Sequence, residues 1–499
     1  MPPRSLPTPR AVRALDMLCL ALVVLSVVVA MSGGFRVRLG AWRIAATSPY
    51  PLLLWALAIG IVRHFVSPAA PIYRDLPANL AAWWREPGVH TAAIVVAGTR
   101  PAILFVGYMA LLTFGYPPGP EPPKQVNNEL VNLPARWDAN WYLGIATEGY
   151  QFVADKPGMQ QSIAFFPAYP MLVRLVGRIF GGYVPGYLAA GMLVSLAAFF
   201  GALVYLYFLA RDSLGEDEAR FAVWLTAAYP FALFFSAIYA EPLLLLGLVA
   251  TFYYFTNGRF GRAALFGVLV GLTKTNGFLL SIPLAMLAVS PLVGTKGWTG
   301  ATGWMGNMPG LAGTGGTGRM GRTDGTGGTQ NGSRIATALL AASAPGIGML
   351  IYSAYIWRLT GDPLGWLRAH GAWGREYQGL AVLVGDRINI IANAGLQGYV
   401  ASLPHDVLNA LGVVFVLITA WPVARKLGLA YAVFILIFIL PPLAAGGLIS
   451  AGRFSSVLFP AFLWMAGAVP ARHRGAWLAS FAAIQALNAA MFYTWRPLY

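Results

Sequence analysis

The chain has 499 residues, of which 58% are hydrophobic and only 10% are charged. Soluble proteins carry about 25% charged residues, so this composition excludes a soluble globular protein. The formal net charge is +16, but the basic residues are scattered between apolar runs. This pattern is typical of orientation in a membrane and of contact with anionic lipid or phosphate, rather than of nucleic-acid binding. The single cysteine, Cys19, excludes a disulfide within the chain and does not indicate a compartment.

Apolar runs of membrane-spanning length recur from end to end and predict an all-α polytopic membrane protein. Residues 1–99 are expected to form an N-terminal extension with two transmembrane helices. The first, Ala14 to Met31, has no small-residue cleavage site after it, so we interpret it as retained rather than as a signal peptide. Apolar and basic residues alternate around Gly40 and predict a small β-hairpin. The second span covers about Pro49 to Val62.

Residues 100–293 are interpreted as the first part of the core, with a long polar loop at 117–183. This loop ends in Met171 to Phe180, where two arginines four residues apart are typical of a helix that lies in the membrane interface. The apolar runs of this part are Arg100 to Tyr116, Gly186 to Ala210, Phe221 to Ile238, Leu243 to Phe255, Ala263 to Leu272 and Phe278 to Leu292. The last two are short, so they form either two short, tilted helices or one broken helix.

Residues 294–334 form a Gly/Thr-rich linker that cannot bury a core, so we predict that it is disordered and cytoplasmic. Residues 335–499 are expected to form the C-terminal transmembrane part, with a second polar loop at 358–405. Its apolar runs are Ile335 to Trp357, Val407 to Ala424, Ala430 to Leu448, Phe454 to Val469 and Gly475 to Tyr493.

These runs amount to about 13 crossings. With the N-terminus inside, the short basic connections fall on the cytoplasmic side, as the positive-inside rule requires. The alternation then places a set of polar residues on the outer side: Asp138, Glu148, Glu241, Lys274, Asp362, Arg368, Arg375 and Arg453. The alternation follows from the apolar runs alone, so the common side of these polar residues is informative.

Asp138 is the leading candidate for an acid–base residue. It lies between Trp137 and Trp141, close to Arg136, in the first outer loop. Aromatic rings can stack on the apolar face of a sugar while a carboxylate accepts a hydroxyl proton. The alternative is an interfacial aromatic belt around a structural salt bridge. Glu148 either takes part in the site or, more simply, helps to fold the loop.

Glu241 lies at a polar break between two apolar runs, where a buried charge is costly unless it is paired or hydrated. It is therefore a functional candidate, and its alternative is a structural salt bridge to Lys274. Lys274 and Arg453 each lie at the outer end of a run and can hold a phosphate leaving group.

Arg368 and Arg375 are seven residues apart, with Trp366 and Trp373 beside them, and share one face if the segment is helical. Such a face suits a lipid phosphate and equally an ordinary interfacial helix. The histidines are dispersed, with no HExxH motif, which argues against a tight transition-metal site. No metal ligands or cofactor are assigned; weak Mg²⁺ or Mn²⁺ binding at Asp138 stays an open alternative.

Several of these motifs together resemble the PIG-V-like mannosyltransferases, the family of GPI mannosyltransferase II and many bacterial proteins. The matching residues, in order, are Arg136-Trp137-Asp138, Trp141-Tyr142, Ile145-Ala146, Gly149-Tyr150, Phe165-Phe166-Pro167, Tyr169-Pro170, Tyr239-Ala240-Glu241-Pro242, Thr273-Lys274-Thr275-Asn276-Gly277, Gly361-Asp362-Pro363, Trp373-Gly374-Arg375 and Ser450 to Pro460. The resemblance covers about Arg100 to Tyr493. This sequence departs from the family pattern at two positions: Ala240-Glu241-Pro242 stands where the family has Ser-Glu-Ser, and Lys274 stands where an arginine is common.

The resemblance implies a GT-C-type bundle with two long extracytoplasmic loops that carry interfacial helices. It implies an inverting glycosyltransferase that moves a mannosyl, or other hexosyl, residue from a polyprenyl- or dolichyl-phosphate sugar to a glycan or lipid acceptor. By motif match Asp138 is the general base, and Glu241 is the second catalytic candidate. The residues expected to bind substrate are Arg136, Trp137, Trp141, Tyr142, Glu148, Tyr169, Lys274, Asn276, Asp362, Arg368, Trp373, Arg375 and Arg453.

The alternative function is a multi-pass transporter or flippase of a lipid-linked or anionic substrate, which the short pair of segments around Lys274 favours. No internal repeat supports that alternative. The expected partners are the lipid-phosphate sugar, a glycan or glycolipid acceptor and the bilayer, with no nucleic acid. The composition suggests a bacterial plasma membrane with the site facing outward; in a eukaryote the same site would face the lumen of the endoplasmic reticulum.

Overall fold

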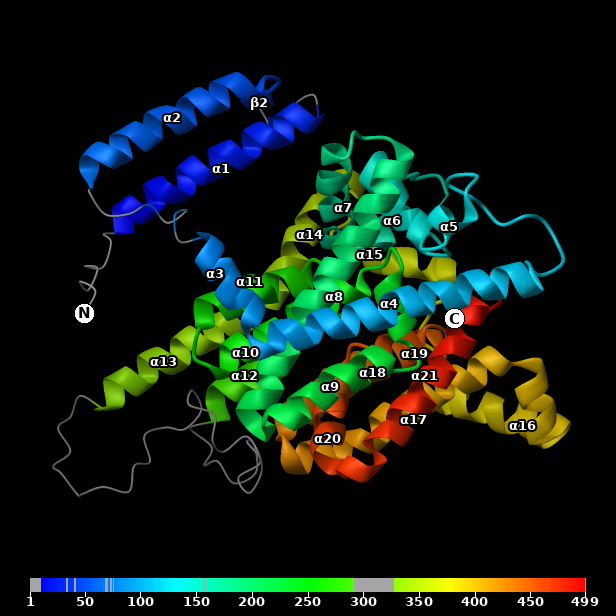
Figure 1. Cartoon of the computed structure of the whole chain (residues 1–499). Helices are drawn as coiled ribbons and strands as arrows, with labels where there is room; N and C mark the ends of the chain where they lie inside the picture. The colour runs from blue at the N-terminus through cyan, green and yellow to red at the C-terminus, as the bar shows by residue number, and fades with distance from the viewer. Residues whose placement is uncertain are drawn as a thin grey trace, which may run out of the picture.

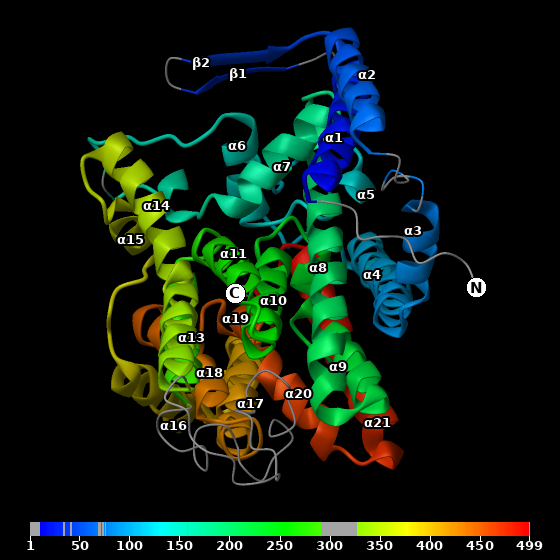
Figure 2. The same cartoon turned by 90° about the vertical axis from the view of Figure 1, so that its left-hand side faces the viewer.

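A computed structural model of the chain confirms the predicted all-α polytopic architecture (Figures 1 and 2). The described residues are 10–32, 35–39, 42–67, 71, 74, 76–156, 158–290 and 327–498.

Among these residues, eight helical stretches are long and apolar enough to cross a membrane. They are α1 (Arg10–Ser32), α2 (Pro49–Val66), α4 (Pro87–Phe114), α8 (Val184–Leu214), the consecutive pair α13 (Gly327–Ala342) and α14 (Ala344–Thr360), α17 (Pro404–Lys426), α18 (Leu429–Gly446) and α21 (Ala471–Tyr493). Each overlaps one of the predicted apolar runs, although α4 begins at Pro87, well before the run predicted from Arg100.

The predicted count of 13 crossings is not confirmed, because the other five runs form shorter helices. These are α9 (Glu216–Ala228), α10 (Glu241–Thr256), α11 (Phe260–Gly271), α12 (Ser281–Val289) and α20 (Phe459–Ala468). The run predicted at Phe221 to Ile238 is broken at Pro230, which cannot continue a helix, and resumes as the 3-10 helix η3 (Ala232–Ser236). This irregular backbone is fully buried, the setting in which such backbone survives at membrane depth.

Helices α8 and α10, with η3, form the centre of the bundle. Helix α8 packs against α4, α7 (Ala168–Ile179), α9 and α10, and it runs through the middle of the molecule in Figure 2. Small residues permit close approach: a Cβ on Gly247 of α10 would lie 2.7 Å from Val270 of α11. The segment from Phe221 to Val249 is almost entirely buried and supplies the rigid support of the site described below.

The two predicted polar loops carry short helices. The first loop contains α5 (Glu129–Asn132), α6 (Ala139–Thr147), η2 (Ser162–Ala164) and α7, which corresponds to the predicted interfacial helix; the second contains α15 (Gly365–Arg368), η7 (Ala369–Trp373) and α16 (Leu380–Ser402). The remaining elements are α3 (Leu76–Arg85), η4 (Gly277–Leu280) and α19 (Ala451–Ser455). The two loops meet where η2 contacts α15 and η7, and the site lies beneath this contact.

The predicted linker lies largely outside the described residues, which stop at 290 and resume at 327. Helix α13 begins at Gly327, so the last residues assigned to the linker are helical. Extending a helix by one residue is much easier than starting one, and the apolar segment from Ile335 provides the start.

The predicted β-hairpin is confirmed, with β1 (Phe35–Leu39) antiparallel to β2 (Trp42–Ala46). It joins α1 and α2, which pack along each other at the edge of the molecule (Figure 1). A buried ion pair connects the two helices: Arg63 Nε lies 2.6 Å from Asp16 Oδ1, and both side chains are at most 4% exposed. Charges at such a position are costly unless they are paired, so this pair links the two helices specifically, together with hydrogen bonds from Cys19 and Ser26 of α1 to backbone carbonyls of α2.

We expect Asp16→Ala to destabilise the α1–α2 hairpin by about 3–5 kcal/mol, because it leaves the Arg63 guanidinium buried without its carboxylate. Thermal unfolding in detergent and protease sensitivity of the hairpin would measure the loss. The double variant Asp16→Arg with Arg63→Asp, which exchanges the two charges, should recover part of the lost stability. If apolar contacts alone hold α1 and α2 together, neither variant should change the stability.

Candidate active site

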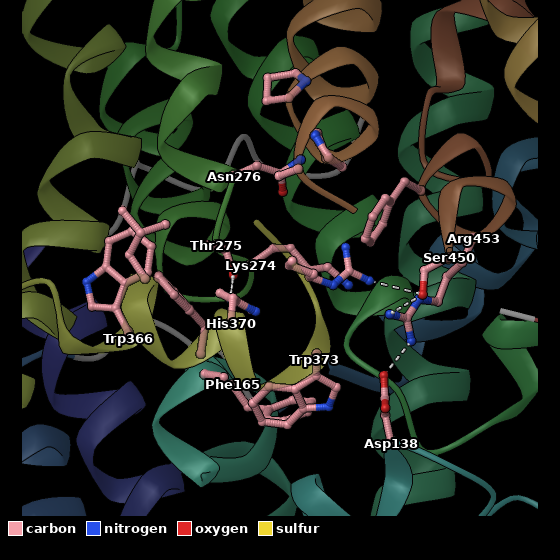
Figure 3. Close-up of a pocket in the computed structure, with 18 of the residues that line it drawn as sticks. Asp138, Phe165, Lys274, Thr275, Asn276, Trp366, His370, Trp373, Ser450 and Arg453 are labelled. Carbon is pink, nitrogen blue, oxygen red and sulfur yellow. Dashed lines mark hydrogen bonds and ion pairs between the residues drawn. The ribbon is translucent and has the colours of Figure 1, made fainter. Parts of the chain in front are cut away.

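A strained turn holds Asp138 at the start of α6. Trp137 has a φ of 54°, and this left-handed conformation costs a bulky residue about 1–3 kcal/mol. The Tyr239 hydroxyl accepts a hydrogen bond from the Asp138 N–H (3.2 Å) and donates one to the Arg136 carbonyl (3.3 Å). Tyr239 thereby fixes the backbone on both sides of Trp137. The turn directs the Asp138 carboxylate at Arg453, with Oδ2 at 2.7 Å from Nη1 (Figure 3).

Arg453 comes from the five-residue helix α19 and is only 5% exposed. Ser450, which directly precedes this helix, is also left-handed (φ 63°), and its hydroxyl accepts a hydrogen bond from Arg453 Nη2 at 3.3 Å. The guanidinium lies 5.4–5.7 Å from the ring centres of Phe234, Tyr239 and Phe454. Aromatic faces stabilise a cation that water does not solvate.

Glu241 lies behind Arg453 at the first residue of α10, where the helix dipole favours a negative charge. Its Oε1 is 3.3 Å from Arg453 Nε and accepts a short hydrogen bond from Lys274 Nζ. Its side chain is 1% exposed. The alternative of a salt bridge between Glu241 and Lys274 is therefore what the structure contains.

Lys274 is presented by a turn between α11 and η4, so the two short segments are separate helical pieces around a break. The turn closes tightly: a Cβ on Gly277 would lie 2.2 Å from the Val270 carbonyl oxygen. Asn276 in this turn donates a hydrogen bond to the Phe438 carbonyl at 3.2 Å, which attaches the turn to α18.

The second loop contributes Arg375 and His370. Arg375 donates to Ser450 Oγ at 3.3 Å, so one hydroxyl serves two arginines. Burial lowers the pKa of Arg375 to about 10, and the charge of Arg453 adds to this effect, so Arg375 stays cationic at neutral pH. His370 Nε2 lies 3.1 Å from Thr275 Oγ1. Burial, and then the charges of Arg375 and Lys274, lower the pKa of His370 to about 4, so it is neutral.

Aromatic rings from both loops form one wall of the site. Trp141 stacks on Phe165, with ring centres 5.7 Å apart, and Trp373 meets both rings edge to face at 5.6 and 5.8 Å. In Figure 3 Phe165 and Trp373 lie together on the side of the cavity next to Asp138. The wall therefore presents apolar ring surface close to a carboxylate.

These groups surround a cavity of about 460 Å³. Its charged and polar part is lined by Asp138, Thr273, Lys274, Thr275, Asn276, His370, Arg375, Ser450 and Arg453. Its apolar part continues between η4 and α18, along Phe278, Leu279, Pro441, Pro442, Ala445 and Ile449. One cavity thus joins a charged end to an apolar groove.

The structure brings together seven of the fifteen residues named from the sequence. Asp138, Tyr142, Lys274, Asn276, Trp373, Arg375 and Arg453 line the cavity. Glu241 and Trp141 lie directly behind this lining, Glu241 against Lys274 and Trp141 against Phe165 and Trp373.

Three others lie outside the cavity in the first loop. Arg136 is fully buried and donates to the carbonyls of Tyr493 (3.2 Å) and Asn132 (3.2 Å), besides its ion pair with Glu129. Tyr169 is buried, with its hydroxyl at 3.0 Å from the Gly191 carbonyl. Glu148 is exposed and accepts a hydrogen bond from Gln151.

Trp137, Asp362 and Arg368 also lie outside the cavity lining. The Trp137 indole donates to the Phe492 carbonyl at 3.2 Å. Arg368 is 76% exposed and pairs with Asp362 at 3.2 Å. The shared helical face expected for Arg368 and Arg375 does not form, because α15 and η7 end at Trp373 and the left-handed Gly374 turns Arg375 inward.

Sequence reasoning gave no role to His370, Ser450, Phe454 and Tyr239, which shape the site. His370 is one of several dispersed histidines, and its position between Trp366 and Trp373 was the available signal. Ser450, Phe454 and Tyr239 lay within matched blocks, and that position was the available signal. The described residues contain no group of three or more His, Cys, Asp or Glu side chains that could hold a metal ion.

The low pKa of His370 predicts a loss of stability in acid. Between about pH 6.5 and 4 the unfolded chain binds a proton at this histidine and the folded chain does not, so stability falls as the pH drops through this window and is fully present above it. The expected loss from pH 7 to pH 5 is about 2 kcal/mol. Melting of the detergent-solubilised protein at both pH values should show a smaller loss for His370→Gln, and an unchanged loss for the exposed His90→Gln.

Comparison with known proteins supports a class for this site. The family model described as Mannosyltransferase (PIG-V) matches residues 119–289, which include Asp138, Glu241 and Lys274. The resemblance expected from the motifs is thus confirmed over this range, and it supports a membrane glycosyltransferase.

Among solved structures, the chain is similar to the Archaeoglobus fulgidus oligosaccharyltransferase, determined in complex with Zn and sulfate, with 14% identity and a TM-score of 0.36. The similarity covers 80% of this chain and 53% of that one, so the chain spans about half the length of that protein. No curated protein matches the chain.

Proposed function

We propose that the protein transfers a mannosyl, or other hexosyl, residue from a polyprenyl- or dolichyl-phosphate sugar to a glycan or lipid acceptor, with inversion at the anomeric carbon. The observation that carries this proposal is the Asp138–Arg453 contact inside a cavity that also contains Lys274 and Arg375. A displacement with a phosphate leaving group requires a base for the acceptor hydroxyl and cations for the leaving phosphate.

The charges at the site favour an anionic substrate. Three cations, Lys274, Arg375 and Arg453, face two carboxylates, Asp138 and Glu241, which leaves one positive charge in excess. Arg375 hydrogen-bonds a neutral hydroxyl and packs over Phe454, so it can turn to a phosphate without breaking a carboxylate pair that the structure records. Charge-assisted contacts of this kind are roughly twice as strong as hydrogen bonds between neutral groups.

The apolar groove suits the lipid part of the donor. It runs from the charged end of the cavity along η4 and α18, two apolar elements of the membrane bundle. A polyprenyl chain can lie there with its phosphate near the three cations. The aromatic wall of Phe165 and Trp373 can receive the apolar face of the sugar ring.

In the proposed step, Asp138 accepts the proton of the acceptor hydroxyl as that oxygen attacks the anomeric carbon. The bond from this carbon to the phosphate oxygen breaks, and the phosphate leaves with the electron pair, stabilised by the cations. Because one displacement occurs from the face opposite the leaving group, the configuration inverts. Glu241 holds Lys274 and Arg453 in place for this step.

The face of the membrane is part of the proposal. The site lies among the two long loops, while the short basic connections predicted to be cytoplasmic lie at other turns of the bundle. The positive-inside rule then predicts that the site faces away from the cytoplasm. This is the outer face of a bacterial plasma membrane, or the lumenal face of the endoplasmic reticulum in a eukaryote.

The test is transfer by the purified protein in nanodiscs. Labelled polyprenyl-phosphate mannose, supplied with a membrane lipid and glycan extract, should yield a mannosylated product that mass spectrometry detects. Digestion with anomer-specific mannosidases, or NMR, should show that its anomeric configuration is inverted. A donor that stays intact with every extract would contradict the proposal.

The broken helix around Lys274 is the observation that suits a transporter. The same protein in sealed vesicles separates the two functions. A transporter or flippase would move the lipid-linked sugar across the bilayer with its phosphate bond intact, and a glycosyltransferase would break that bond.

A further inference from the structure

The end of α21 and the residues that follow it, 492–498, contact the supports of both Asp138 and Arg453. On the Asp138 side, the Trp137 indole donates to the Phe492 carbonyl at 3.2 Å, and its ring packs on Trp495 with centres 4.8 Å apart. Arg136 Nε donates to the Tyr493 carbonyl at 3.2 Å. The two residues immediately before Asp138 are therefore attached to the end of α21.

On the Arg453 side, the connection passes through Asn409 of α17, which is 1% exposed. Its Nδ2 donates to the Leu498 carbonyl at 2.6 Å, and its Oδ1 accepts from the Gly452 N–H at 2.8 Å. Gly452 directly precedes Arg453 and packs against Phe231 so closely that a Cβ would lie 2.1 Å from the ring. One buried amide thus joins Leu498 to the helix that carries Arg453.

The segment itself is held in an unfavourable conformation. Three non-glycine residues in the described part of the chain have positive φ, and they are Trp137, Ser450 and Trp495 (φ 59°). The buried Trp495 indole N–H has no hydrogen-bond partner among the described residues. Each feature costs about 1–3 kcal/mol, so the surrounding contacts must impose this geometry. Arg496, which donates to the Gly115 carbonyl at 3.1 Å, is one of these contacts.

We propose that Trp495 and Asn409 are positioning residues that hold the Asp138 carboxylate and the Arg453 guanidinium in register from one backbone segment, residues 492–498. This inference rests on the proposed function for its catalytic meaning. The cavity lining contains neither residue, so both act through Trp137 and Gly452. Because misplacing a reacting group by about 1 Å can cost about 100-fold in rate, this bracing would control kcat rather than substrate binding.

The test compares Trp495→Ala, Trp495→Phe and Asn409→Ala in the transfer assay. Trp495→Ala and Asn409→Ala should lower kcat about 10- to 100-fold, with the KM for the lipid donor nearly unchanged. Trp495→Phe keeps a ring against Trp137 and loses only an N–H without a partner, so it should retain most of the activity. The exposed Trp421→Ala on α17 is the control and should match the original protein.

A stability cycle separates failure of this inference from failure of the proposed function. The melting shifts of Trp495→Ala and Asp138→Asn should be non-additive in the double variant, and those of Trp421→Ala and Asp138→Asn should add. The melting measurement does not depend on enzymatic activity, so it tests the coupling of Trp495 to Asp138 even if the protein transfers no sugar. Normal kcat in a stably inserted Trp495→Ala variant, a change in KM alone, or additive shifts for the Trp495 and Asp138 pair would each overturn the inference.

Discussion

Asp138→Asn is expected to lower kcat for sugar transfer by about 10²–10⁴-fold, because an amide has the shape of the carboxylate but cannot accept the hydroxyl proton. The amide oxygen can still accept the hydrogen bond from Arg453 that the structure shows at 2.7 Å. The turn at Trp137 and the aromatic wall are not altered by the change. The KM for the lipid-phosphate donor should therefore change little, and steady-state kinetics in nanodiscs would measure both constants.

The matched control is Asp155→Asn, which makes the same chemical change on an exposed residue of the same loop. It should leave both constants unchanged. Single-turnover measurements should place the Asp138→Asn defect in the chemical step, since product release does not require a base. Normal transfer by a stably inserted Asp138→Asn variant would show that the carboxylate is not the base and would direct attention to another proton acceptor.

The long spans and the polar loops were predictable because they depend on local properties of the chain. A run such as Gly186 to Ala210 contains no charge and can only be a membrane helix. The hairpin around Gly40 follows from alternation over ten residues. The break at Lys274 was expected from the two short runs that flank it, but the break at Pro230 was not, because irregular backbone at that depth is tolerated only through burial by other helices.

The sequence partly predicted which residues form the site, but it did not predict which of them contact one another. Charge in an apolar chain identified Asp138, Glu241, Lys274 and Arg453 as candidates. The Asp138–Arg453 contact joins residues 315 positions apart, and no spacing in a single sequence reveals such a contact. The geometry around Asp138 also depends on the contact of Trp137 with Trp495, near the other end of the chain.

The errors in placing side chains have one physical origin. Arg136 resembles a ligand-binding cation by sequence, yet backbone carbonyls and Glu129 use its donors inside the protein. Arg368 and Arg375 have the same spacing as neighbours on a helix, yet Gly374 separates an exposed from a buried position. Sequence identifies which groups need partners, and the tertiary fold decides which partners they find.

Glu241→Gln is expected to cause the largest loss of stability in the core. The carboxylate is 1% exposed and lies against Lys274 and Arg453, so its neutralisation leaves three cations around the single carboxylate of Asp138. Removing one partner of a buried ion pair costs about 3–5 kcal/mol, because the remaining charge stays buried without compensation. The apparent melting temperature in detergent should fall accordingly, and transfer activity should be lost with it.

The double variant Glu241→Gln with Lys274→Met distinguishes a charge effect from a packing effect. If the loss comes from uncompensated charge, removing Lys274 as well should recover part of the stability, and the two single changes should be strongly non-additive. The exposed pair of Glu216 and Arg220 is the control, and Glu216→Gln should leave the melting temperature unchanged, since exposed pairs contribute little. Activity should not return in the double variant, because the cavity then has one cation fewer for the phosphate. Recovered stability without recovered transfer would separate the structural task of Glu241 from the catalytic task of the cations that it holds.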